Sequence, residues 1–145
     1  MAIFQKTKYF SPSTDLFDIG RLKKIRNLES LTIAGTTACN YEALAKFPKL
    51  TRLNLSGAKI GNTSFLKQLI NLEYLGLRET GITDISFVAN MKNLRELDIS
   101  RTQVKDLRVL KKLTGLKKLN VKNVRLSYEQ IEFLEKELPD LEIEY

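Results

Sequence analysis

Leucines recur at a fixed interval along most of this chain. The interval is 22 residues, and the leucines are Leu28, Leu50, Leu72, Leu94 and Leu116. The fourth and sixth places of each period are also apolar, and they hold Leu31 and Ile33, Leu53 and Leu55, Leu75 and Leu77, Leu97 and Ile99, and Leu119 and Val121. Self-similarity with this period predicts a stack of similar units that bury a common core.

The two halves of each period have different hydrophobic spacing. The Leu-x-Leu pair alternates with a period of two, which predicts a short strand with one buried face. The second half, as in residues 85–91, has apolar residues three apart, which suits a helical turn. One repeat cannot bury both halves, so neighbouring repeats must stack and pair their strands in parallel. We expect an α/β solenoid: a right-handed, curved parallel sheet with short helices or turns on its convex side.

At these residues the chain resembles the leucine-rich repeat family. The period and the Leu-x-x-Leu-x-Leu core are similar to its short-repeat class, which includes the internalins and a phosphatase regulatory subunit. The resemblance covers residues 14–145, and segments 80–85 and 102–107 are similar to intracellular bacterial members. It implies a leucine-rich repeat solenoid that binds a protein partner.

The ninth place of each repeat departs from the family pattern. A buried asparagine is usual there, whereas this chain has Thr36, Ala58, Thr80, Thr102 and Val124. A threonine hydroxyl can still bond the backbone of a turn, but alanine and valine have no such group. We therefore expect looser turns at Ala58 and Val124.

The whole chain, 1–145, is expected to form one leucine-rich repeat domain with a cap at each end. Residues 1–27 are interpreted as a degenerate first repeat, in which the strand places are Tyr9 and Ser11 and the helical places are Leu16, Ile19, Leu22 and Ile25. Residues 28–126 form the core repeats. Residues 127–145 form a helix–strand cap, because Ser127 and Gln130 have capping-box spacing and residues 141–145 repeat the strand pattern.

Composition excludes several kinds of site. The chain has no histidine, and Cys39 is its one cysteine. A disulfide within the chain, a Cys/His zinc site, a Ser-His-Asp triad and a Cys-His dyad are therefore excluded. Glu96 and Asp98 could share acid–base work, but they lie on an open strand face, and there is no phosphate-binding loop. We expect a protein that is not an enzyme and has no cofactor and no metal.

The N-terminal segment lacks the pattern of a secretory signal. Lys6 and Lys8 interrupt the apolar start after Phe4. No stretch approaches the roughly 18 apolar residues of a membrane helix. We expect a cytoplasmic protein that does not contact a membrane, and a monomer rather than an oligomer.

The exposed side of the predicted sheet is the candidate binding face. In each strand the third, fifth and seventh places point away from the core, and neighbouring strands lie about 4.8 Å apart. Repeats three to five place tyrosine and arginine there, the residue types that dominate interface energies. The candidate protein-binding residues are Arg52, Tyr74, Arg78, Glu96, Asp98, Arg101, Lys118 and Lys122.

The same charges also have a purely structural interpretation. Opposite charges on adjacent strands can stabilise a sheet by pairing within it. The candidate pairs are Glu73 with Arg95, Glu79 with Arg101, and Glu96 with Lys118. Beside them, Gly76 is expected to leave a shallow gap in the face. The sequence leaves open whether the charges pair internally or contact a partner.

The basic segment 105–125 supports an alternative function. The net charge is +7, and this segment holds eight lysines and arginines against one acid, Asp106. Such a field attracts acidic partners and nucleic acid backbones, although aromatic residues for base stacking are not interleaved with it. We expect a non-catalytic protein–protein interaction module, as a regulator or inhibitor. The alternatives are a binder of nucleic acid or acidic surfaces through 105–125, and a self-assembling structural unit.

Overall fold

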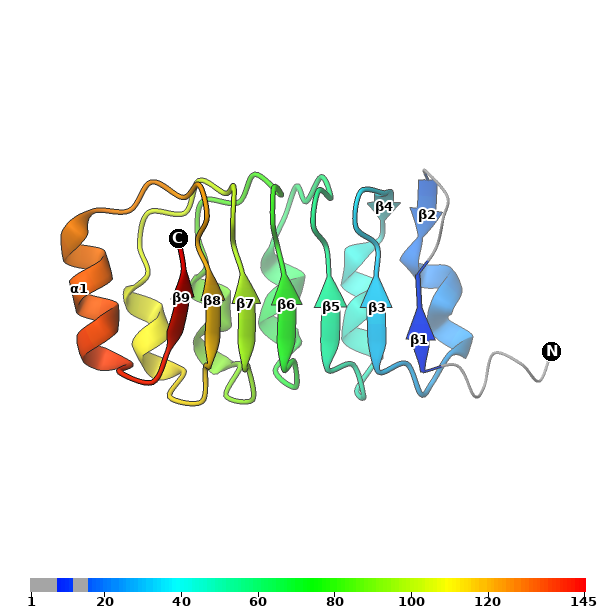
Figure 1. The fold of residues 1–145 in the computed structure, drawn as a ribbon. Coiled ribbons are helices and arrows are strands. Elements are labelled where there is room, and N and C mark those ends of the chain that lie inside the picture. Colours follow the sequence, from blue (N-terminus) through cyan, green and yellow to red (C-terminus); the bar gives the residue numbers. More distant parts are fainter. Residues whose placement is uncertain (1–7, 12–15) are drawn as a thin grey trace.

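The protein is a stack of strand–turn–helix units with one long parallel sheet along its side. The structure, a computed structural model, describes residues 8–11 and 16–145 (Figure 1). Its main sheet has the order β1-β3-β5-β6-β7-β8-β9, and every neighbouring pair is parallel. These strands are Tyr9–Phe10, Ser30–Thr32, Arg52–Asn54, Tyr74–Gly76, Glu96–Asp98, Lys118–Asn120 and Glu142–Glu144.

The return segments carry short helices behind the sheet. Within residues 8–11 and 16–145, five are 3₁₀ helices, namely η2 (Ile19–Lys24), η3 (Tyr41–Lys46), η4 (Ser64–Gln68), η5 (Ser86–Asn90) and η6 (Arg108–Lys112). The sixth, α1 (Tyr128–Glu137), is an α-helix. A spacing of three between apolar residues fits the three residues per turn of a 3₁₀ helix. Near the N-terminal end, β2 (Leu16–Asp18) and β4 (Thr37–Cys39) form a second, two-stranded sheet.

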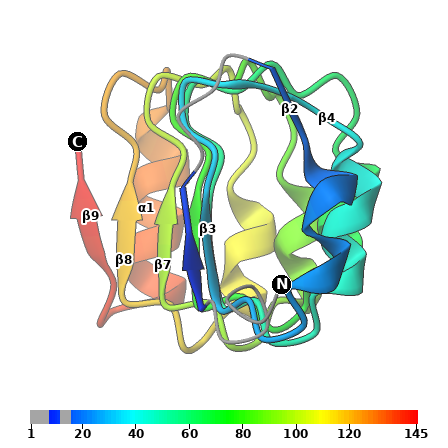
Figure 2. The same cartoon turned by 90° about the vertical axis from the view of Figure 1, so that its right-hand side faces the viewer.

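The middle residue of each core strand points inward. Its row consists of Leu31, Leu53, Leu75, Leu97 and Leu119, which are paired in register and at most 2% exposed. The core is one continuous cluster along the stack. Figure 2 shows that the later strands are displaced progressively toward the open side of the sheet. The exposed face is therefore hollowed toward its C-terminal end, and the predicted leucine-rich repeat solenoid is confirmed.

Each core repeat leaves its strand through a left-handed residue at the eighth place. These residues are Gly35, Gly57, Glu79, Arg101 and Asn123, with φ angles of 66°, 71°, 58°, 55° and 59°. Glycine adopts this conformation at little cost, whereas glutamate and arginine do so against steric resistance from Cβ. Repeats three and four therefore place charged side chains where repeats one and two have none.

The ninth place closes the turn. The hydroxyls of Thr80 and Thr102 each donate to a backbone carbonyl three residues earlier, at 2.6 Å. Looser turns at Ala58 and Val124 are not found, because the backbone N–H of each still donates to the carbonyl three residues earlier at 2.9 Å. Ala58 is also 1% exposed. Backbone bonds and burial hold these turns without a hydroxyl.

The N-terminal repeat is offset by one residue from the predicted register. Tyr9 pairs with Ser30 and Phe10 with Leu31, an offset of 21 residues. Phe10 therefore packs on the core, while Tyr9 is 70% exposed on the open face and Ser11 follows the strand. The helical half is confirmed for Ile19, Leu22 and Ile25, which are buried. The predictions for 1–7, 12–15 and the Leu16 side chain lie outside the described residues.

The C-terminal helix and strand form as expected, but the predicted capping box at the start of the helix does not. The Ser127 side chain makes no capping hydrogen bond at the start of α1. Gln130 instead turns toward the preceding repeat, where its Oε1 accepts from the backbone N–H of Leu107 at 2.9 Å. This N–H lies at the start of η6, where a helix has no intrahelical partner for it. Leu134 and Leu138 are buried beneath α1.

Candidate protein-binding face

Strand geometry presents all eight predicted binding residues on or beside the open face. Four of them begin their strands and form one row in register, namely Arg52, Tyr74, Glu96 and Lys118. Asp98 ends β7. The other three, which follow strands at the upper edge, are Arg78, Arg101 and Lys122. The structure thus brings the eight residues together, and their role in binding stays a prediction.

Tyr74 is the centre of this face. Its ring contacts the Arg52 guanidinium, whose central carbon lies 4.5 Å from the ring centre. Burial raises the pKa of the Tyr74 hydroxyl, and the negative charge of Asp98 raises it further, while Arg52 acts in the opposite direction. The ring is half-buried rather than fully exposed.

The gap predicted at Gly76 is already filled. A Cβ built on Gly76 would lie 2.8 Å from both the Tyr74 hydroxyl and the Asn54 side-chain oxygen. Gly76 itself is buried. A glycine at this strand end therefore lets the tyrosine lie flat across the sheet, because any side chain would displace it. The glycine positions Tyr74 and does not provide a pocket.

The last strand residue has a structural role in three repeats. The side-chain oxygens of Asn54, Asp98 and Asn120 each accept from the backbone N–H two residues later, at 2.9–3.0 Å. This local bond is the usual way in which Asn and Asp stabilise a turn. Asp98 thus uses one oxygen for the turn and has a second oxygen for other contacts.

The three predicted pairs between adjacent strands do not form. Within residues 8–11 and 16–145, no ion pair within 4.0 Å joins Glu73 to Arg95, Glu79 to Arg101 or Glu96 to Lys118; the ion pairs there are Lys8–Glu29, Asp106–Arg108, Lys117–Asp140 and Lys122–Glu144. Arg95 instead donates to the carbonyl of Gly115 at 2.9 Å. A carbonyl of the next turn lies within reach of this long side chain and competes with the carboxylate. Most charges at the centre of the face are therefore not neutralised by internal partners.

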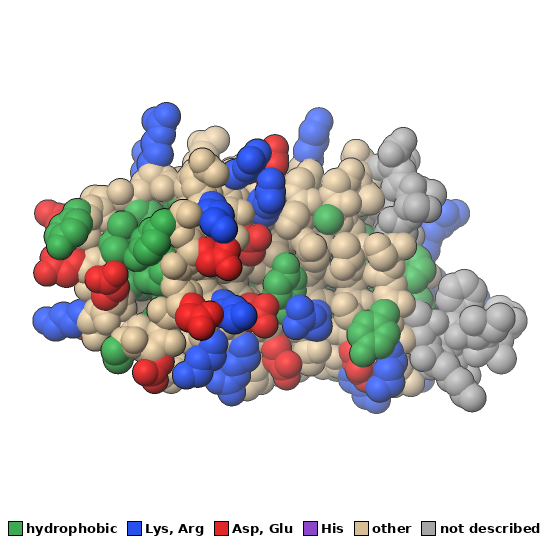
Figure 3. Space-filling model, viewed as in Figure 1, with side chains coloured by type: hydrophobic (Ala, Val, Ile, Leu, Met, Phe, Trp, Pro, Cys, Tyr) green, Lys and Arg blue, Asp and Glu red, His purple; other side chains and the backbone are tan. Residues whose placement is uncertain are grey.

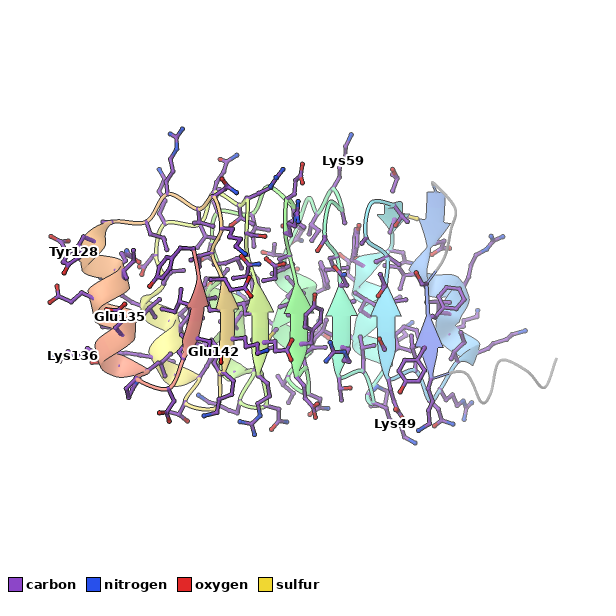
Figure 4. All side chains as sticks on the ribbon, viewed as in Figure 1. Lys49, Lys59, Tyr128, Glu135, Lys136 and Glu142 are labelled. Carbon is purple, nitrogen blue, oxygen red and sulfur yellow. The ribbon has the colours of Figure 1, made fainter. Side chains whose placement is uncertain are left out.

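Sequence reasoning missed two residues of the face. Glu142 and Glu144 belong to β9, which pairs with β8 and extends the open face by one strand. Figure 4 shows Glu142 beside β9, while Tyr128 and Lys136 project from α1 away from the sheet. The last repeat is longer than the others, so Glu142 lies 24 residues after its neighbour Lys118 and falls outside the 22-residue count. The alternation in 141–145 was the available signal.

These glutamates help to line a hollow at the C-terminal end of the face. Its volume is about 160 Å³, and its walls come from β6, β7, β8 and β9. The polar side chains in these walls are Tyr74, Glu96, Asp98, Lys118, Asn120, Glu142 and Glu144. Figure 3 shows acidic and basic side chains gathered over these strands, whereas the surface over β3 carries few charges.

The basic segment 105–125 does not form one patch. It spans almost one period, so it passes once around the solenoid. Lys111 and Lys112 end η6 behind the sheet, and Lys118 lies on the open face. Arg108 pairs with Asp106 and lowers the pKa of that carboxyl to about 2. The physical reason is that residues 22 apart in sequence become neighbours in space, so basic residues that follow one another in sequence lie on different sides of the solenoid.

The described residues contain two further negative findings. They hold no group of three or more His, Cys, Asp or Glu side chains placed to bind a metal ion. No helix among them combines the length and apolar character needed to cross a membrane. Cys39 is a free, exposed thiol.

Comparisons with known proteins agree with this geometry. A family model described as leucine-rich repeats (2 copies) matches residues 70–112. The solved internalin C2 of Listeria monocytogenes is 26% identical, with a TM-score of 0.83 over 94% of this chain and 60% of its own. A second internalin of that organism is 29% identical, with a TM-score of 0.78 over 89% of this chain and 37% of its own.

A plant protein shares the fold at lower identity. It is the ectodomain of the Arabidopsis thaliana membrane receptor kinase GASSHO1/SCHENGEN3, solved in complex with Casparian strip integrity factor 2. It is 20% identical, with a TM-score of 0.67 over 88% of this chain and 16% of its own. The present chain thus spans 60% or less of each of these solved chains. No curated protein matches it significantly in sequence. The repeat match over residues 70–112 and the likeness to the internalins support a leucine-rich repeat protein that resembles the internalins.

Proposed function

We propose that this chain is a non-catalytic protein-binding module whose partner lies across the concave sheet face from β5 to β9. The observation that carries the proposal is the contact between Arg52 and Tyr74 at the centre of an open sheet face. Tyrosine and arginine at the centre of a surface are the residue types whose removal costs most in protein complexes. The proposed contact residues are Arg52, Tyr74, Arg78, Glu96, Asp98, Arg101, Lys118 and Lys122.

The left-handed turns support the same part of the face. Glu79 and Arg101 occupy positions where glycine would cost less, and glycine is what the first two repeats have. Residues held in strained conformations are concentrated at functional sites. A charged side chain at a position that favours glycine supports a contact between that side chain and a partner.

The fold adds support by analogy. Solenoids offer extended concave surfaces to other molecules, and the plant ectodomain was solved with a protein factor bound. A module of this kind acts by covering part of another protein, as a regulator or inhibitor. The cytoplasmic location and the monomeric state expected from the sequence are part of this proposal.

Binding of nucleic acid has less support. The basic residues of 105–125 are distributed over several sides of the solenoid, and three of them, Arg108, Lys117 and Lys122, pair with carboxylates. Phosphate recognition needs several free cations along one surface. A self-assembling unit is likewise not favoured by any contact among the described residues.

The test compares matched truncations on and off the face. The partner is purified with the tagged chain from its native cell, identified, and titrated against variants by calorimetry. We expect Tyr74→Ala and Arg78→Ala each to weaken binding tenfold or more, because each removes a central anchor. Tyr128→Ala and Arg125→Ala are the controls, since they delete the same side chains from exposed positions off the face.

Two outcomes would contradict the proposal. If both face variants bind as well as the unmodified chain, the concave centre is not the site. If the co-purified material is lost on nuclease treatment and binding falls steeply with salt, the nucleic-acid alternative is correct.

A further inference from the structure

The hollow at the C-terminal end of the face has a charge opposite to that of the whole chain. The chain carries +7, yet four carboxylates line the hollow with one ammonium group, Lys118. A partner that docks here meets this local field at short range. The net charge of the protein influences only the approach from a distance.

Two of the four carboxylates have a polar partner among the described residues. Glu144 pairs with Lys122 at 3.1 Å, and Asp98 uses one oxygen for the Ser100 turn. Glu96 and Glu142 lie on either side of Lys118 in the same row, and within the described residues neither makes an ion pair within 4.0 Å. Acidic charge therefore exceeds basic charge around the hollow.

Tyr74 lies between this acidic region and Arg52 on β5. Arg52 contacts the ring, whereas Tyr74 itself also lines the hollow. The negative charges of Asp98 and Glu96 both act to raise the pKa of the Tyr74 hydroxyl, after burial. An aromatic wall beside carboxylates is a favourable surround for a guanidinium or an ammonium group.

We infer that the hollow between Tyr74 and β9 receives one arginine or lysine side chain from an extended segment of the partner. The inference rests on the proposed function and specifies the chemistry of the partner at that face. Charge complementarity to Glu96, Asp98 and Glu142 selects this occupant, because an acidic side chain would enter a site already rich in negative charge.

The charges at the edges of the face indicate which residues should flank the cation in the partner segment. Arg78 and Arg101 are exposed at the upper edge of the face, and Arg95 and Lys117 are exposed at its lower edge. A uniformly basic segment would meet like charges at both edges. The best partner thus has a central cation with acidic or neutral residues on either side.

The experiment uses two labelled peptides with the full chain. One peptide has a single arginine at the centre of nine residues with serine at the other places, and the other peptide has glutamate in place of that arginine. Binding of both is measured by fluorescence anisotropy. We expect the arginine peptide to bind and the double variant Glu96→Gln, Glu142→Gln to weaken it at least tenfold. The matched control is Glu132→Gln, Glu137→Gln, which removes the same charge from exposed positions on α1 and should change affinity less than twofold.

A second variant protects the test against a structural effect. Asp98→Asn keeps the oxygen that accepts from Ser100 and removes only the charge, so its turn is preserved. It should also weaken the arginine peptide. The inference is overturned if the arginine peptide does not bind, if the control pair weakens it as much as the hollow pair, or if the glutamate peptide binds more tightly at the same place.

The purified native partner distinguishes this inference from the proposed function. If Tyr74→Ala abolishes its binding while the Glu96→Gln, Glu142→Gln pair leaves it intact, the face is the site and the cationic occupant is wrong. If both leave binding intact, the proposed function itself fails. Loss of binding in both variants supports the proposed function and the cationic occupant.

Discussion

Arg52 and Tyr74 stand opposite each other on β5 and β6, with the Arg52 guanidinium carbon 4.5 Å from the centre of the Tyr74 ring. The ring in turn covers Gly76, two residues further along its own strand. The Tyr74 side chain thus connects the neighbouring strands β5 and β6, and it occupies the space that a side chain at Gly76 would need. The predicted site residue has a structural contact as well as a proposed binding role.

This contact should be measurable as a coupling energy. In a double-mutant cycle with Arg52→Ala and Tyr74→Leu, we expect a coupling of about 0.5–1 kcal/mol in the free energy of unfolding, the range of exposed cation–π pairs. Urea denaturation of the four proteins measures it. The control is a second cycle in which Arg125→Ala, a change off the face, takes the place of Arg52→Ala. Strict additivity in the Arg52 cycle would show that the contact contributes nothing to stability.

The raised pKa of Tyr74 predicts a dependence of stability on alkaline pH. Because burial holds the folded pKa above the ordinary value of 10.0, the unfolded tyrosine ionises first as pH rises. The contribution is therefore complete below pH 10 and is lost as pH rises through the folded pKa. Tyr74→Phe removes this ionisable group, so the difference in unfolding free energy between variant and parent should shift in favour of the variant as pH rises above the ordinary tyrosine pKa of 10.0. An unchanged difference would refute it.

At the left-handed turn positions, introducing a glycine should raise the stability of the fold, and removing a glycine should lower it. Glu79→Gly and Arg101→Gly remove steric strain of about 1–2 kcal/mol and add chain entropy of about 0.5–1 kcal/mol to the unfolded state. We expect each to stabilise the fold by up to about 1 kcal/mol in thermal or urea unfolding. Gly57→Ala is the reciprocal control, and it should destabilise because Gly57 has a φ of 71°. Destabilisation by both glycines would mean that their side chains matter to the fold.

The start of α1 separates two explanations of the C-terminal cap. Gln130→Ala removes the partner of the Leu107 N–H and should cost about 1–3 kcal/mol, the penalty for an unpaired, partly buried donor. Ser127→Ala should cost less, because the Ser127 side chain makes no capping bond. Unfolding midpoints of the two variants decide the order. A larger loss at Ser127 would restore the capping box expected from the sequence.

Much of the fold could be predicted from the leucine period alone. Leu53, Leu75 and Leu97 are buried in register because identical repeats can bury their apolar faces only by stacking in phase. The offset of one residue at Tyr9 was not predictable, because the first repeat lacks the leucines that specify the register. The candidate face followed from the same alternation, so Tyr74 and its neighbours lie together as expected.

Side-chain partners were not predictable in the same way. Arg95 bonds a carbonyl of the next turn rather than Glu73, and Gln130 bonds Leu107 rather than its own helix end. The Arg95 side chain could reach more than one acceptor, and the Gln130 side chain more than one donor. Only the packing of the turns decides which of these groups lies within hydrogen-bond distance. Glu142 was missed because the longer final repeat disturbs the count.

The amino-acid sequence by itself determined the repeat, the parallel stacking and the inward row of leucines, since these depend on the periodic burial of apolar area. Tertiary structure decided the charge of the face. It placed Glu142 and Glu96 on either side of Lys118 on neighbouring strands, and it divided the basic segment 105–125 among several sides of the solenoid. The reason is geometric: in a coil with this period, residues near in sequence point in different directions, and residues one turn apart become neighbours.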